Sequence, residues 1–106
     1  MARTLINLPR NPKRGEVIEI RTLIQHGMET GYRPNDSGQV VPRDIVRRFV
    51  CELDGQVVFS ADLFPAVAAN PYVAFFVRAH ASGTLRLQWS GDNGFAQTEM
   101  VALNVA

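Results

Sequence analysis

The chain has 106 residues, of which 46% are hydrophobic and 20% are charged, a composition typical of one ordinary globular domain. Eleven basic residues against ten acidic ones leave a net charge of +1, which gives no electrostatic case for binding nucleic acid or an anionic membrane. The single cysteine, Cys51, excludes an internal disulfide, and no segment approaches the roughly 18 consecutive apolar residues of a membrane span.

The first two runs of strand-favouring residues are 4–8 and 16–24. In the second run, three isoleucines share one phase while Glu19 and Arg21 occupy the other. This alternation indicates a strand with one buried face.

A long polar connection follows, from Gln25 to Asp44, with a predicted hairpin tip at 35–38. Connections of this length in a small domain are often functional or disordered. We expect this one to contact a partner through side chains near its start, namely His26, Met28, Glu29 and Thr30.

The third and fourth runs are 45–53 and 56–63. Asp54-Gly55 between them predicts a two-residue hairpin turn, because both turn positions favour a positive φ. Cys51 lies in phase with Phe49 and Leu53, which places it in the core, where a thiol is inert. Val46 and Val50 are expected on the opposite face.

The fifth run, 72–80, is apolar in both phases, unlike a strand with one face in solvent. Either loops cover its second face or that face binds a partner, since interfaces are enriched in aromatic residues. On the second reading, Tyr72 and Phe76 are the anchoring side chains. The remaining runs are 84–89 and 95–105.

Seven short strands in one chain of this length predict an all-β fold, an immunoglobulin-like antiparallel β-sandwich spanning residues 1–106 as a single domain. The Cys…Trp…Cys framework of antibody domains is missing.

The chain has few residues that could act as catalytic groups or metal ligands. We expect no catalytic residue, no metal site and no cofactor. His26 and Met28 have side chains that suit copper, but two neighbouring candidates fall short of the three or four ligands that a site needs. Arg43, Arg47 and Arg48 cluster in sequence, but strict alternation would send Arg47 and Arg48 to opposite faces of their strand.

Several segments, in order along nearly the whole chain, resemble the SoxZ family of thiosulfate-oxidation proteins. They are 13–24, 26–33, 42–51, 65–72 and 82–85. The second includes His26-Gly27-Met28-Glu29-Thr30-Gly31, where the family usually has His-Pro-Met-Glu-Thr-Gly.

The resemblance implies an immunoglobulin-like fold and a heterodimer with SoxY, the subunit that carries sulfur intermediates on a cysteine of a mobile C-terminal arm. This sequence ends Leu103-Asn104-Val105-Ala106 and resembles the subunit without that arm. Transient contacts with cytochrome, hydrolase and dehydrogenase components are implied as well. The family works in the periplasm, and because Met1–Arg10 does not read as a signal peptide, we expect co-export with a partner that bears the signal.

Two other functions stay open at this point. Cys51 could serve a stand-alone sulfur-transfer enzyme as nucleophile or sulfur acceptor. Alternatively, the chain is a homo-oligomeric, ligand-binding sandwich.

Overall fold

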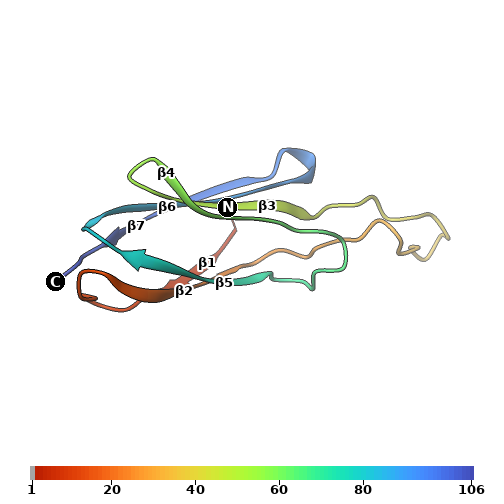
Figure 1. Ribbon diagram of the computed structural model, residues 1–106. Coiled ribbons are helices and arrows are strands. Elements are labelled where there is room, and N and C mark those ends of the chain that lie inside the picture. The colour runs from red at the N-terminus through yellow and green to blue at the C-terminus, as the bar shows by residue number, and fades with distance from the viewer. Residues whose placement is uncertain (1) are drawn as a thin grey trace.

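The computed structural model describes residues 2–106, which form seven strands and one short 3-10 turn. The elements are β1 (Thr4–Asn7), β2 (Glu16–Ile24), β3 (Val46–Leu53), β4 (Gln56–Asp62), β5 (Tyr72–Ala79), β6 (Gly83–Gly91), η1 (Asp92–Gly94) and β7 (Ala96–Leu103). Each strand begins and ends within two residues of its predicted run. Two antiparallel sheets, β1-β2-β5 and β4-β3-β6-β7, face each other as two layers (Figure 1). The predicted all-β sandwich is therefore confirmed.

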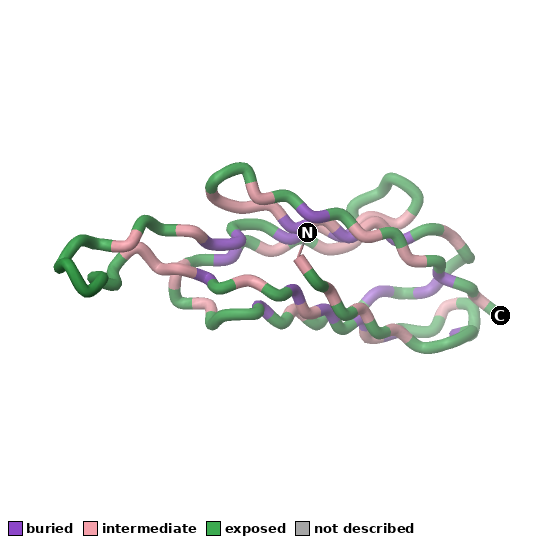
Figure 2. Tube along the Cα trace, turned by 180° about the vertical axis from the view of Figure 1, so that it is seen from behind, coloured by how far each residue is buried: buried purple, intermediate pink, exposed green. Residues whose placement is uncertain are grey.

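The core lies between the two sheets and is formed by alternate residues of the central strands (Figure 2). Its centre is aromatic: Phe49 of β3 packs against Trp89 of β6, with ring centroids 5.1 Å apart, and against Phe75 of β5 at 5.6 Å. Phe59 of β4 stacks on Phe75 at 4.5 Å. The two contacts of Phe75 join the sheets. Aromatic pairs of this kind add stability beyond the apolar area they bury.

The turn between β3 and β4 has the predicted form. Asp54 and Gly55 have φ values of 49° and 84°, as a type I′ turn requires at its two central positions. The Asp54 carboxylate also accepts a hydrogen bond from the amide of Thr84 at 2.9 Å, which ties the turn to β6.

A β-bulge at the start of β3 corrects the expected phase of this strand. Val46 pairs with Gly91 and Arg48 with Ser90, so Arg47 has no partner in β6. The extra residue shifts the alternation: Val46 joins Phe49 in the core instead of lying opposite it, and Arg47 and Arg48 are both exposed. The expectation that the two arginines lie on opposite faces was therefore wrong.

Gly91 makes this bulge possible. A Cβ atom at this position would lie 2.9 Å from the Cα of Val46 and still closer to the carbonyl of Ile45. Glycine inside a strand often marks such a close approach of two backbones.

The connection between β2 and β3 leaves the sandwich as a long hairpin, which we call the loop arm (residues 25–44; orange to yellow at the right of Figure 1). Backbone pairs hold its two sides together, with Glu29 and Asp44 exchanging two hydrogen bonds of 2.8 Å and Val41 donating to Arg33 at 2.8 Å. Residues 32–40 at its tip are all exposed (Figure 2). No helix in the described part of the chain is long and apolar enough to cross a membrane.

Candidate functional site

The three-stranded sheet turns an apolar face to solvent, which we call the outer face of β1-β2-β5. In β5, Phe75 and Val77 point into the core, whereas Tyr72 and Phe76 point outward and are 59% and 66% exposed. No loop of residues 2–106 covers these two rings. Loops within residues 2–106 therefore do not provide the cover that the first of the two readings expected.

Strand register extends this surface across the sheet. Leu5 of β1 pairs with Leu23 of β2, which pairs with Tyr72 of β5, so these three side chains form one row on the outer face. Leu5 is 65% exposed, and the row borders a hollow of about 370 Å³. Phe76 lies two outward-facing positions beyond Tyr72 on β5, opposite Glu19.

The polar groups of the outer face largely pair with one another. Arg21 donates from Nε to the Glu19 carboxylate at 2.8 Å, and this contact raises the pKa of Arg21. Arg78 donates to the carbonyl of Gly15 at 2.7 Å. An apolar centre with satisfied polar groups around it is the usual composition of a protein interface.

β5 also ends its sheet, since the strand order is β1-β2-β5. A strand at the edge of a sheet presents backbone donors and acceptors that can pair with another chain. The outer face of β1-β2-β5 is therefore bordered by a backbone edge that is open to pairing.

The start of the loop arm is packed inward. Met28 is only 5% exposed, and its sulfur accepts a hydrogen bond from the amide of Val46 at 3.2 Å. Met28 has a φ of 52°, and its own amide donates to Nδ1 of His26 at 3.0 Å. The structure thus places Met28 in the core at the base of the arm, where a partner would reach it only if the arm moved.

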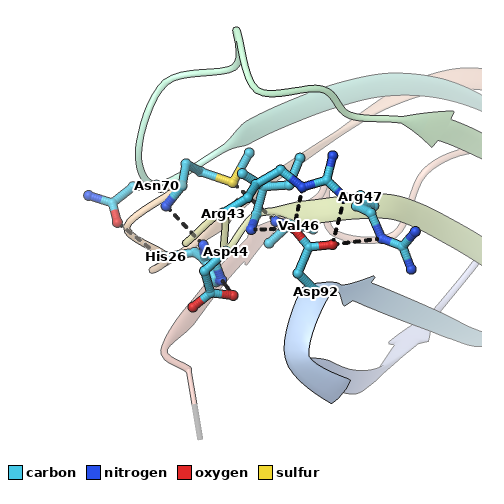
Figure 3. A network of polar contacts seen from close by, with 9 residues as sticks. His26, Arg43, Asp44, Val46, Arg47, Asn70 and Asp92 are labelled. Atoms are coloured by element: carbon cyan, nitrogen blue, oxygen red, sulfur yellow. Dashed lines mark hydrogen bonds and ion pairs between the residues drawn. The ribbon is translucent and has the colours of Figure 1, made fainter. Parts of the chain in front are cut away.

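His26 is held from several sides at the same place. Its backbone exchanges hydrogen bonds with Asn70, and its Nε2 lies 3.9 Å from the Asp44 carboxylate (Figure 3). Its ring meets Phe95 edge-on, with centroids 4.9 Å apart. Only 9% of the side chain is exposed. His26 therefore fixes the entry of the arm.

Glu29 and Thr30 lie further out and are half-buried. Glu29 binds the Arg33 guanidinium, with a shortest distance of 2.6 Å, and this hydrogen bond lowers the pKa of Glu29. The Thr30 hydroxyl accepts from the amide of Tyr32 at 3.2 Å, and Tyr32 itself is 80% exposed. Of the six predicted contact residues, four lie on the loop arm and two, Tyr72 and Phe76, lie on β5.

At the base of the arm, Asp92 joins two arginines (Figure 3). Arg43 binds both oxygens of Asp92 at 2.8 and 3.0 Å, and Arg47 approaches one of them at 3.3 Å. Burial acts to raise the pKa of Asp92, but hydrogen bonds from Arg43 and the amide of Ile45, with both arginine charges, lower it overall. Sequence patterning missed this group, although Gly91 carried a signal for the bulge that creates it.

Cys51 lies inside the sandwich with no exposed surface. Burial, with a smaller contribution from the Glu52 charge, raises its thiol pKa to about 11. A nucleophilic or sulfur-accepting cysteine must be accessible and present as the thiolate, and neither condition holds. Among residues 2–106, no three His, Cys, Asp or Glu side chains come together in a group that could hold a metal ion.

The family model for the sulphur oxidation protein SoxZ matches residues 6–102. The chain belongs to the SoxZ family. No curated relative matches the chain at a significant level.

Solved structures agree with this SoxZ-family fold. The superoxide reductase (neelaredoxin) from Ignicoccus hospitalis is similar with a TM-score of 0.70 and 16% identity, over 99% of this chain and 82% of that one. The sulfur carrier protein SoxY from Chlorobium limicola f thiosulfatophilum is similar with a TM-score of 0.66 and 13% identity, over 96% and 74%. At such identities the likeness shows the immunoglobulin-like sandwich fold alone.

Proposed function

We propose that this SoxZ-family chain is the non-catalytic subunit of a heterodimer with a SoxY-like sulfur carrier, and that it binds this carrier through the outer face of β1-β2-β5. The main observation in support is the pair of exposed aromatic rings, Tyr72 and Phe76, on an edge strand. Family membership supports a role in sulfur oxidation. The solved SoxY has a similar sandwich, so two sheets could pack face to face.

The buried state of Cys51 supports a binding role over the alternative of a sulfur-transfer enzyme. A partner would present the sulfur, and this chain would stabilise the carrier and help to present its cargo to the cytochrome, hydrolase and dehydrogenase components. We assign the exposed tip of the loop arm, which includes Tyr32, to those transient contacts. Cys51→Ser should leave sulfur transfer by the reconstituted complex intact, and abolition would favour the enzyme instead.

The affinity for SoxY from the same host tests the proposal. Truncation of a central interface aromatic commonly costs 2 kcal/mol or more, so we expect Phe76→Ala to weaken binding at least about 30-fold in isothermal titration calorimetry. Met100→Ala is the matched control, because Met100 is 62% exposed on β7 of the other sheet. Equal affinities for Phe76→Ala and the wild type would refute the assignment.

The same calorimetry, combined with native mass measurement, distinguishes the proposed heterodimer from the remaining alternative, a homo-oligomeric sandwich. A homo-oligomeric ligand-binding sandwich would keep one native mass whether or not SoxY is added. The proposal predicts a shift to the mass of a one-to-one heterodimer.

We also propose a periplasmic location, reached by co-export in complex with a signal-bearing partner. The proposal rests on membership in the SoxZ family. Fractionation of cells that express this chain with and without SoxY tests the proposal. Recovery of the chain from the periplasm without SoxY would contradict it.

A further inference from the structure

A hollow of about 390 Å³ lies where the loop arm returns to the four-stranded sheet. It is bordered by Arg43 at the end of the loop arm, by Arg47 and Arg48 at the start of β3, and by the segment that follows β4. The β-bulge creates this grouping, since without it Arg47 would point away from Arg48. We call it the arginine hollow.

The arginine hollow carries more positive charge than its own carboxylates balance. Asp92 is shared by Arg43 and Arg47, and Asp62 pairs with Arg48 at 2.8 Å. Three guanidinium groups thus face two carboxylates.

The arginines are also only partly engaged. Arg43 is bound to Asp92 in bidentate form, but Arg47 and Arg48 each use one nitrogen in their ion pairs. Their side chains are 59% and 51% exposed, so the guanidinium donors outside these ion pairs are open to a further acceptor.

An apolar surface adjoins these donors. Phe64, the second residue after β4, is 64% exposed at the rim, and Pro65 lies beside it. The buried side chains of Ile45 and Leu63 complete the lining. A free inorganic anion would use the arginines and leave Phe64 in water.

We propose that the arginine hollow is a docking site for an acidic segment of a partner protein, one that carries carboxylates next to an apolar side chain. Its carboxylates bind the open forks of Arg47 and Arg48, in the planar geometry that guanidinium groups favour. Its apolar side chain packs on Phe64. The excess of one positive charge suits a short acidic segment and is too small for a polyanion such as nucleic acid.

This docking site is separate from the proposed SoxY interface. The arginine hollow belongs to the β4-β3-β6-β7 sheet and the base of the arm, whereas Tyr72 and Phe76 lie on the other sheet. Both surfaces can therefore be occupied at once, and each proposal can fail without the other.

Titration of the isotopically labelled full chain with a synthetic peptide of alternating Asp and Leu tests the proposal by NMR. We expect saturable shifts of the amides of Arg47, Arg48, Leu63 and Phe64. The matched Asn-Leu peptide should produce none of these shifts. Sodium sulfate, added at the concentration of the peptide while the total ionic strength is held constant, should not displace the acidic peptide. Displacement would mean a site for free anions and would overturn the proposal.

Three variants sharpen this titration. Arg47→Gln/Arg48→Gln should weaken peptide binding at least about tenfold, because two charged contacts are lost. Arg86→Gln is the control: Arg86 is 42% exposed on the same sheet, pairs with Glu52 at 3.5 Å and lies outside the hollow. An equal loss in Arg86→Gln would indicate nonspecific charge attraction, and no loss in the double variant would remove the arginines from the site. Either result contradicts the proposal.

Phe64→Ser, which leaves the charges in place, should weaken binding as well, and unchanged affinity would contradict the apolar half of the site.

Discussion

The thiol of Cys51 shows how position within a strand determines the chemistry of a residue. Its neighbours in phase, Phe49 and Leu53, turn toward the core, and β6 presents Leu87 opposite it. In this apolar environment the thiolate loses its hydration without gaining a cationic partner, and the pKa therefore rises to about 11.

We predict that Cys51 does not react with iodoacetamide in the native protein at neutral pH and reacts readily in denaturant. The raised pKa also affects stability. A thiol with an ordinary pKa of 9.0 when unfolded and about 11 when folded stabilises the native state fully below pH 9.0, and this contribution is lost as the pH rises toward 11. Mass spectrometry of the alkylated protein checks the first outcome, and denaturant midpoints across that pH range check the second. Rapid alkylation of the native chain would contradict the burial of Cys51.

At the scale of elements, β5 has opposite roles on its two faces. Phe75 is 3% exposed and contacts Phe49 and Phe59, which lie on the other sheet. Phe76, the next residue, is 66% exposed. The same residue type thus holds the sandwich together at one position and is available to a partner at the next.

Alanine at these two positions should separate folding from binding. Phe75→Ala should lower the free energy of unfolding by about 3–5 kcal/mol, as expected when a buried phenyl ring is removed. Phe76→Ala should change it by no more than about 0.5 kcal/mol, since its ring is mostly in water. Urea denaturation of the isolated chain measures both. Similar losses at the two positions would mean that the outer face is covered.

Strand periodicity predicted the sandwich, the inward phase of Cys51 and the two apolar faces of β5, because all three follow from regular alternation. It failed at Arg47, where one inserted residue shifts the phase, and the arginine hollow was missed with it. Met28 was predicted as a contact side chain because it lies in a polar connection. Its burial depends on Val46 and His26, which meet it only in the folded chain.

At the scale of the whole molecule, the chain is an elongated sandwich, and the two surfaces that we propose for partners are separate. The outer face of β1-β2-β5 offers exposed aromatics and an open strand edge. The arginine hollow lies at the base of the loop arm, on the other sheet. This separation suits a subunit that holds one partner stably while it meets others.

Hydrogen exchange of this chain with and without SoxY tests the central claim most directly, because it maps protection along the backbone. We predict that SoxY slows exchange in Tyr72–Ala79 and Thr4–Asn7 and leaves Ala96–Leu103, on the far edge of the other sheet, unchanged. Protection confined to Ala96–Leu103, with Tyr72–Ala79 unaffected, would contradict the account.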